Sequence, residues 1–505
     1  MTKEEIKNDK DNQVVIIGGG PAGLTAAYSL CKASVPSVVL EKDSTVGGIS
    51  RTVNYKGYLF DIGGHRFYTK VKAVDDIWRE VLSETEFLRR ARLSRIYYNK
   101  RFFHYPLRAF EALFKLGLWN SGLILTSYLR ARLFPSKEEE TFEQWITNRF
   151  GKHLYRIFFK TYTEKVWGMP CNKISADWAA QRIKGLTLFS TIKNAFFKPG
   201  AKHKNTAIKT LIDEFDYPLK GPGMMWERMA EILSRRNSRI HLNTVVESIL
   251  WKEREVTGVG AVTDGRRETI SGTHFISSMP IRELIRKLSP SAPSEVIEAA
   301  DQLKYRDFIT VALIVNKTDL FPDNWIYIHD KEVKVGRVQN YKNWSKSMVP
   351  DETRTCLGLE YFCFEGDGLW TMTNDELINL GKRELQKLGL AQECDVEDGF
   401  VVKMPKAYPV YDSQYHKSLR IIRNFVSQFG NLQLIGRNGM HKYNNQDHSM
   451  LTAMLAVENI LGGNHDLWSV NTEQEYYEED LANQHTKTAE ITTLLSTQPK
   501  VPKRN

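Results

Sequence analysis

The sequence predicts an α/β fold in which a parallel sheet is interrupted by an inserted domain of helices and antiparallel strands. Two short apolar runs near the beginning, Val14–Ile17 and Ser37–Leu40, are separated by a glycine-rich turn and a helix. A third apolar run, at 432–435, lies near the other end of the chain and leads into another glycine turn. Because these runs have the composition of buried parallel strands, we predict one Rossmann-type domain assembled from distant segments.

The first glycine turn has the pattern that binds a dinucleotide. Gly18 permits the tight turn after the strand, Gly20 lets a phosphate approach the backbone, and Gly23 allows the helix to pack closely on the strand. Pro21 and Ala22 begin the helix, whose N-terminus attracts an anion. The segment therefore predicts binding of a dinucleotide pyrophosphate.

The residues after the second strand continue the same pattern. Glu41 is placed to accept hydrogen bonds from the ribose hydroxyls, and Lys42 follows it directly. Gly47 and Gly48 allow a second close approach of the backbone to the cofactor. The next predicted strand, at 58–62, ends in another pair of glycines. Strand, glycines, helix, strand and acid in this order are far more specific than a glycine pattern alone.

The remaining strands are predicted in separate segments later in the chain. The composition from 89 to 213 is helical, aromatic and basic, and strands are expected again at 240–249 and 274–280, with a hairpin turn at Asp264-Gly265. A strand at 310–315 and a helix from about Ser449 to Leu461 follow. We predict a charged leader at 1–13, three parts of the cofactor-binding domain at 14–88, 214–290 and 431–463, a mainly helical insert at 89–213, a sheet-rich substrate domain at 291–430, and a polar tail at 464–505.

Composition narrows the class of protein. The apolar fraction of 42% and charged fraction of 26% are those of a soluble globular protein. The five cysteines have neither metal-site nor disulfide-framework spacing, and the leader has no apolar core, so we predict a cytoplasmic protein without a metal. The net charge of +10 suits a phosphorylated substrate, an anionic membrane or a merely solvated basic face. No helix-turn-helix or zinc-finger spacing accompanies it, which argues against nucleic acid.

The longest charge-free apolar stretch, at 116–129, is too short to cross a bilayer. We expect it to form a helix in the core. The alternative is a helix that lies on a membrane surface, because Arg130 and Arg132 follow it directly.

Several segments resemble the FAD-dependent amine oxidase and protoporphyrinogen oxidase superfamily, and within it the UDP-galactopyranose mutases. The amino-terminal part of the resemblance is 41–65, which ends in Gly63-Gly64-His65. The mutase-like segments are 165–170 with Trp178 and Arg182, 336–341 with Asn343 and Ser345, and 436–439 with Lys442, Tyr443 and 445–449. The resemblance runs from about 14 to 463.

The resemblance implies FAD as the cofactor, active in its reduced form, with NAD(P)H as a candidate reductant. It adds to the cofactor-binding residues named above a further set: Gly64, His65, Val246, Gly436, Arg437, Asn445, Gln446, Asp447 and Ser449. His65 is expected near flavin N5. The helix near Ser449 is expected to direct its positive end at the flavin, which would stabilise the anionic reduced ring.

The resemblance also implies a substrate site and a reaction. Arg182 and Arg337 would hold the diphosphate of a sugar nucleotide, since a guanidinium donates two hydrogen bonds and stays charged. Tyr408 and Tyr443 would add hydroxyl donors, and His65 completes the catalytic set. The implied reaction is pyranose–furanose isomerisation through attack on the anomeric carbon by N5 of reduced FAD, as in cell-surface polysaccharide biosynthesis.

Three features depart from the mutase pattern, one of which is a shorter spacing between Tyr443 and 445–447. Arg108 stands where a neutral residue of the nucleobase pocket is expected, and the run at 109–134 is longer and more apolar. The main alternative is therefore an FAD-dependent oxidoreductase of the protoporphyrinogen oxidase, amine oxidase or desaturase type, acting on an apolar substrate. A flavin-retaining binding protein held at a membrane by its basic surface is a further alternative.

Overall fold

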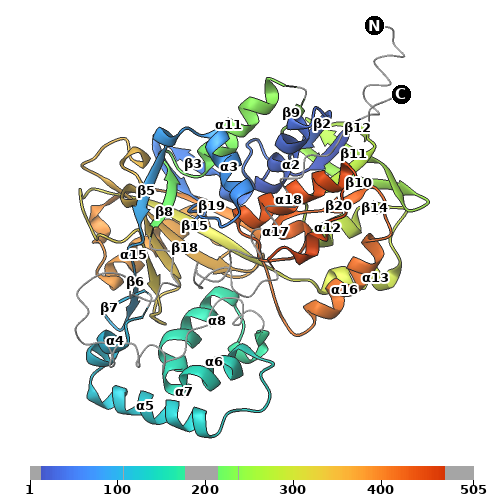
Figure 1. Cartoon of the computed structure of the whole chain (residues 1–505). Helices are drawn as coiled ribbons and strands as arrows, with labels where there is room; N and C mark the ends of the chain where they lie inside the picture. Colours follow the sequence, from blue (N-terminus) through green and yellow to red (C-terminus); the bar gives the residue numbers. More distant parts are fainter. Residues whose placement is uncertain (1–12, 106, 177–213, 237, 472–505) are drawn as a thin grey trace, which may run out of the picture.

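The computed structural model describes residues 13–105, 107–176, 214–236 and 238–471. A parallel-sheet part, a large and mainly antiparallel sheet and a group of helices occupy three regions of the molecule (Figure 1). The parallel sheet has five strands in the order β20–β13–β1–β2–β9. Its strands are β1 (Val14–Ile17), β2 (Ser37–Leu40), β9 (Ser238–His241), β13 (His274–Ser277) and β20 (Leu432–Leu434). Strands from both ends of the chain share one sheet, which confirms the predicted α/β fold with a discontinuous Rossmann-type domain.

Two helices pack against each other beside this sheet. They are α2 (Pro21–Lys32), which follows β1, and α18 (Gln446–Ile460), near the end of the described chain. The helix that we expected to begin near Ser449 thus begins one turn earlier. Asn445 caps it, because its side chain accepts the backbone N–H of His448 in a capping box. The early start brings Gln446 and Asp447 into the first turn.

A smaller sheet extends the cofactor-binding part. It contains β10 (Thr244–Lys252), β11 (Glu255–Thr263), β12 (Arg266–Ser271) and β14 (Leu288–Ser289). The predicted hairpin turn joins β11 to β12, with φ of 49° at Asp264 and 80° at Gly265. Positive φ at both central positions gives the turn the twist that two antiparallel strands require.

The large sheet has seven strands in the order β19–β15–β18–β17–β16–β6–β7. The strands are β6 (Ser94–Tyr98), β7 (Arg101–His104), β15 (Tyr305–Val315), β16 (Trp325–Ile328), β17 (Arg337–Asn340), β18 (Thr355–Cys363) and β19 (Val396–Pro409). All residues of β15 and β18 are buried, so these strands form the centre of a second hydrophobic core. Two further strand pairs are β3 (Thr52–Tyr55) with β4 (Tyr58–Asp61), and β5 (Phe87–Ala91) with β8 (Glu214–Pro218).

The expectation of mainly helical structure from residue 89 was wrong for its first part. Residues up to 104 form β5, β6 and β7, and β6 and β7 belong to the large sheet. Asn99 and Lys100, with φ of 48° and 58°, form the turn of the hairpin between β6 and β7. The basic composition of this segment hid the alternation of buried and solvent-facing residues that is typical of a strand.

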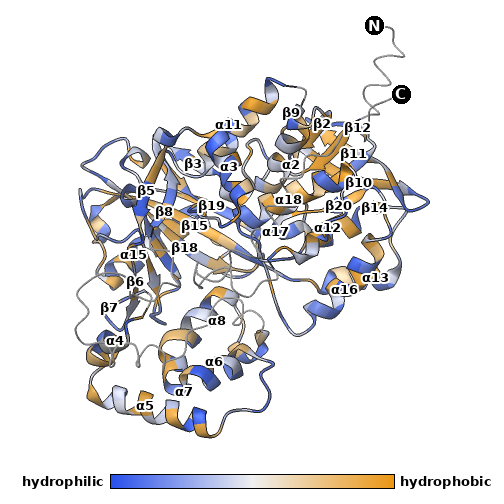
Figure 2. Ribbon diagram, in the orientation of Figure 1, coloured by the Kyte–Doolittle hydropathy of each residue, from blue (hydrophilic) through white to orange (hydrophobic). Residues whose placement is uncertain are grey.

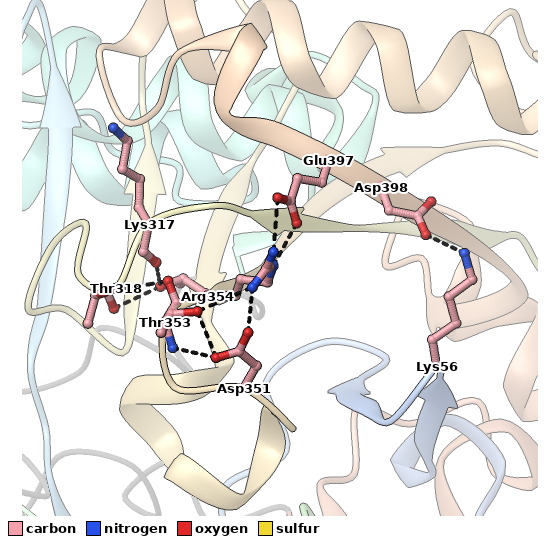
Figure 3. Close-up of polar contacts among 9 residues, drawn as sticks. Lys56, Lys317, Thr318, Asp351, Thr353, Arg354, Glu397 and Asp398 are labelled. Atoms are coloured by element: carbon pink, nitrogen blue, oxygen red, sulfur yellow. Dashed lines mark hydrogen bonds and ion pairs between the residues drawn. The ribbon is translucent and has the colours of Figure 1, made fainter.

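Ion pairs tie the outer edge of the large sheet to neighbouring loops. Lys56, in the turn between β3 and β4, donates to Asp398 of β19 at 2.6 Å (Figure 3). Arg354, just before β18, pairs with Asp351 and, through Nε at 2.7 Å, with Glu397 (Figure 3). Because these side chains are partly exposed, the contacts fix the path of the chain more than they add to stability.

The helical part consists of α4 (Ala109–Leu116), α5 (Leu118–Leu133), α6 (Phe142–Phe150), α7 (Lys152–Leu154) and α8 (Thr161–Trp167). Gly117, with φ of 85°, separates α4 from α5. The apolar stretch that we expected in the core is largely at the surface: α5 buries Ile124, Tyr128 and Ala131 but exposes most of its leucines. The stretch contains enough apolar residues for two helix faces, and among the described residues only one of these faces is buried. Among the described residues, no helix is long and apolar enough to span a membrane.

The remaining helices cover the sheets and connect them. They are α3 (Lys72–Val81), α11 (Gly223–Ser234), α12 (Ile281–Arg286), α13 (Ser294–Gln302), α14 (Tyr341–Trp344), α15 (Asn374–Leu388), α16 (Tyr415–Val426) and α17 (Gly436–Gly439). α15 shows how local sequence sets helix ends. Thr373 forms a capping box with Glu376 at its start, and Gly389, with φ of 70°, ends it in the left-handed conformation.

Candidate active site

One cavity of about 980 Å³ collects residues from the parallel sheet, the large sheet and the helices. Most of the predicted site residues line it: Gly18, Gly20, Pro21, Ala22, Glu41, Lys42, Gly48, Gly64, His65, Val246, Arg337, Tyr408, Gly436, Arg437, Tyr443, Asn445, Gln446, Asp447 and Ser449. Gly23 and Gly47 lie beside the cavity and shape the backbone next to it. Arg182 and Trp178 fall outside the described residues.

The first glycine turn forms a narrow cradle at the N-terminus of α2. Gly18 has a φ of 103°, which favours glycine. A Cβ added to Gly48 would lie 3.4 Å from the Cα of Gly20, so the two glycine backbones approach each other closely at the cavity wall. A Cβ at Gly23 would lie 1.8 Å from the carbonyl oxygen of Gly18. Gly23 therefore serves the packing of α2 on β1, whereas Gly20 and Gly48 line the cavity.

Glu41 is held in place by the backbone. Its Oε2 accepts the N–H of Gly19 at 2.6 Å and its Oε1 accepts the N–H of Asp43 at 2.9 Å. Burial raises the pKa of this carboxyl group. Each oxygen has a second lone pair, so the fixed carboxyl group can also accept hydrogen bonds from a ribose.

His65 is a neutral histidine in the wall of the cavity. Its Nε2 donates to the carbonyl oxygen of Ile62 at 2.8 Å, which leaves Nδ1 as the acceptor. Burial, together with the positive charge of Arg437, lowers the pKa of His65 to about 3. The side chain therefore carries no charge at neutral pH, and Nδ1 can only accept a hydrogen bond.

The C-terminal segment closes the cavity on another side. Arg437 donates through Nε to the carbonyl oxygen of Asn444 at 2.9 Å and through Nη1 to that of Ala407 at 3.1 Å. The first turn of α18 also lines the cavity, and its buried Asp447 offsets part of the positive end of the helix. The expected helix-dipole effect on a reduced flavin is therefore weakened by this carboxyl group.

These features fit FAD. The glycine cradle lies at a helix N-terminus that has no acidic residue in its first turn, as a pyrophosphate requires. Two buried amide oxygens in the cavity wall, Oδ1 of Asn438 and Oε1 of Gln446, lack a hydrogen-bond partner among the described residues. Buried polar atoms of this kind are suited to a polar ring system. Within the same residues, no group of three or more His, Cys, Asp or Glu could hold a metal ion.

On the side of the large sheet, a cation and two tyrosines meet. Arg337 of β17 pairs through Nε with the buried Glu360 of β18, and its Nη2 donates to the hydroxyl of Tyr408 at 3.4 Å. The ring of Tyr408 stacks on that of Tyr443, with centroids 5.6 Å apart and an interplanar angle of 16°. The guanidinium of Arg437 lies 4.9 Å from the ring of Tyr443. Three of the predicted substrate residues thus come together although they are far apart in the sequence.

An aromatic wall that we did not predict lies beside Arg337. Tyr162 of α8 stacks on His329, with centroids 4.7 Å apart and an interplanar angle of 8°, and meets Tyr327 edge-on at 5.6 Å. Burial lowers the pKa of His329 to about 3, so this ring is also neutral. The alternation of Tyr327 and His329 along a strand was a signal for a shared face. The contribution of Tyr162 depends on how α8 packs, and no local pattern shows it.

Some residues of the mutase-like segments support the site without lining it. Lys165 donates to the carbonyl oxygens of Ile328, Asp330 and Val335 at 2.8 to 3.2 Å, which fixes the loop that carries His329. Asn343 binds the carbonyl oxygens of Phe321 and Asp323, both at 2.8 Å.

Arg108 does not lie in the cavity wall. It is exposed at the start of α4, whereas the neighbouring Tyr105 and Leu107 line the cavity. Arg108, whose charge was unexpected for a nucleobase pocket, is therefore not part of this cavity.

The cavity continues into an apolar arm within the helical part. The arm is lined by Leu113, Ile124, Leu125, Phe142, Phe150, Leu154, Phe158 and Phe159. It gives the cavity a polar end, next to Arg337 and the glycine cradle, and an end suited to hydrocarbon.

Comparisons with known proteins agree with this geometry. A family model for flavin containing amine oxidoreductases matches residues 21–438. The fold is similar to that of a reduced UDP-galactopyranose mutase, with a TM-score of 0.78 and 21% identity over 93% of this chain and 100% of that one. An L-amino-acid oxidase of Crotalus adamanteus is 24% identical over 319 residues, 60% of this chain and 58% of that protein. A probable UDP-galactopyranose mutase of Klebsiella pneumoniae is 24% identical over 175 residues, 33% of this chain and 44% of that protein.

The chain thus spans about half the length of these curated relatives. The family match covers most of the chain, from the first residue of α2 through all strands of the large sheet. The chain therefore belongs to the flavin containing amine oxidoreductase family, as a flavin-dependent enzyme with a UDP-galactopyranose mutase-like fold.

Proposed function

We propose that the protein isomerises a sugar nucleotide between its pyranose and furanose forms. The observation that carries this proposal is the meeting of Arg337, Tyr408 and Tyr443 in the same cavity as Gly64 and His65. A fixed cation with two hydroxyl groups suits a diphosphate, and the neighbouring glycine backbone leaves room for a flavin ring. A simple hydride-transfer enzyme with an apolar substrate has no need for this cation.

The chain's own residues would hold the nucleotide while the sugar changes its ring. Reduced FAD, when bound, supplies the nucleophile for the anomeric carbon. Glu360 fixes the plane of the Arg337 guanidinium, so its remaining N–H groups are preorganised for the diphosphate. Tyr408 and Tyr443 would donate hydroxyl protons to the same oxygens, and the held diphosphate would return to the sugar without diffusing away.

A specific observation also favours the alternative, an FAD-dependent oxidoreductase with an apolar substrate. The apolar arm of the cavity contains four phenylalanines and four leucines or isoleucines, and this is more hydrocarbon surface than a nucleotide requires. In that case Arg337 would serve to hold the sheet together through Glu360.

Turnover in the two flavin states tests the proposal. The purified protein is reduced anaerobically with dithionite, and UDP-galactopyranose or UDP-galactofuranose is added and followed by chromatography. We expect interconversion with the reduced protein and none with the oxidised protein. No interconversion, together with rapid reoxidation by oxygen or a quinone, would instead support the oxidoreductase.

A further inference from the structure

The outer surface of the helical part carries a continuous set of exposed apolar side chains. We call it the α4–α5 face; it consists of Phe114, Leu118, Trp119, Leu123, Leu125, Leu129, Leu133 and Phe134. Phe114 is 89% exposed, Leu118 93% and Trp119 81%. Single exposed apolar residues are ordinary, but a contiguous group of this size marks an interaction surface.

The pattern within α5 is that of a helix with two apolar faces. Leu118, Leu125, Leu129 and Leu133 follow one another at helical spacing and are all exposed. Ile124, Tyr128 and Ala131 lie on the other side and pack inside the protein. Figure 2 shows hydrophobic residues along α5 at the lower edge of the molecule, away from both sheets.

The exposed charges within α5 are all basic, whereas the acidic Glu138, Glu139 and Glu140 lie beyond the end of the helix. Arg130 and Arg132 are exposed in the last turn of α5 and project on either side of the leucine stripe, and α5 contains no acidic residue. Arg108, at the start of α4, is exposed as well. An apolar stripe with basic flanks complements a layer of anionic headgroups above hydrocarbon.

The same helices line the apolar arm of the cavity. Leu113 and Ile124 are part of the cavity wall, and so is Leu125, which is also 42% exposed on the outer surface. The face and the cavity are therefore separated by little more than one layer of side chains.

We propose that the α4–α5 face rests on an anionic lipid bilayer, with the leucine stripe in the interface and the apolar arm next to the hydrocarbon. The contact is peripheral, since α5 lies along the surface. The basic residues in the last turn of α5 favour an anionic surface as the occupant, and contact with a second copy of this chain is the alternative that the measurements below separate from it. The proposal holds whichever reaction the flavin site performs.

Co-sedimentation with vesicles tests this contact. The purified full chain, loaded with its flavin, is mixed with vesicles of phosphatidylcholine alone or with added phosphatidylglycerol. We expect binding to the anionic vesicles that weakens with salt. Because each basic residue near an anionic surface contributes to binding, Arg130→Glu/Arg132→Glu should weaken it by about thirtyfold or more. The matched control, Arg266→Glu/Arg267→Glu on an exposed hairpin, should change it much less.

A second set of variants separates insertion from electrostatic attraction. Leu118→Ser/Trp119→Ser should lower binding at least about tenfold, while Leu461→Ser, at an exposed leucine outside the face, should leave it unchanged. With brominated acyl chains, we expect fluorescence quenching that Trp119→Phe reduces without loss of binding.

Two results would overturn the proposal. One is that the wild-type protein does not bind anionic vesicles, or that Leu118→Ser/Trp119→Ser binds them as tightly as the wild type does. The other is a dimer in lipid-free solution, measured by light scattering, that Leu118→Ser/Trp119→Ser converts to a monomer. That result would assign the face to contact between copies. Retention of bound flavin and an unchanged melting temperature show that each variant is folded.

Discussion

At the scale of single residues, the guanidinium of Arg337 makes two contacts that the single ammonium group of a lysine could not make together. Its Nε neutralises the buried Glu360, and its Nη2 reaches Tyr408 at 3.4 Å. The planar guanidinium makes both contacts in fixed directions, whereas an ammonium group is a point charge. A carboxyl group as buried as Glu360 needs such a partner, since an unpaired charge there would be costly.

Arg337→Lys is therefore expected to lower kcat/KM for a UDP-sugar by about a hundredfold while the protein keeps its flavin. The measurement is steady-state turnover of the reduced protein, alongside the flavin absorbance. Arg354→Lys is the matched control, because Arg354 pairs with the carboxylates of Asp351 and Glu397 (Figure 3) and is not among the residues that line the cavity. Equal activity of both variants and the wild type would remove Arg337 from the substrate site.

At the scale of elements, the turn between β1 and α2 separates ligand binding from folding. A Cβ at Gly20 would meet no atom closer than 3.9 Å, whereas one at Gly23 would lie 1.8 Å from a backbone oxygen. The two glycines stand three residues apart in the same motif, but only the second is required by the packing of the chain itself.

Gly20→Ala should thus yield a folded protein that binds flavin at least about tenfold more weakly, because the methyl group occupies the pyrophosphate position. Gly23→Ala should lower the melting temperature and the soluble yield. Circular dichroism and flavin absorbance on both proteins measure the difference. A Gly20→Ala protein with full flavin content would contradict the placement of the pyrophosphate at this turn.

At the scale of the whole molecule, the protein buries histidines in a neutral form. Burial lowers the pKa of His441 to about 4, and its ring packs edge-on against Tyr305 at 4.9 Å. An unfolded histidine titrates near 6.5. Between about pH 6.5 and 4 the unfolded chain therefore binds a proton that the folded chain does not, and this difference lowers stability as the pH falls.

In His441→Gln, residue 441 binds no proton in either the folded or the unfolded state. The free energy of unfolding of the variant, relative to the wild type, should improve from pH 7 to pH 5 with a slope that differs by about one proton. Urea unfolding at several pH values measures it. Parallel curves for wild type and His441→Gln would mean that His441 is not buried in a neutral form in solution.

Much of the cofactor site was predictable because its residues lie in short motifs. The glycine turn, Glu41 and the Gly436–Gly439 segment each carry their own backbone requirement, and the structure brings them to one cavity. The substrate side was predictable only through resemblance, since Arg337, Tyr408 and Tyr443 come from separate segments. Tyr162 and His329 escaped prediction because their stacking depends on the packing of α8 against the loop that Lys165 fixes.

The sequence by itself determined the parallel sheet, its glycine turn and the discontinuous domain, because buried strands and tight turns have local signatures. Only the tertiary structure decided which face of α5 is buried, since both faces are apolar and the packing of the neighbouring helices chooses between them. It also decided that residues 94–104 join the large sheet, because strand pairing with β16 supplies hydrogen bonds that no local pattern records.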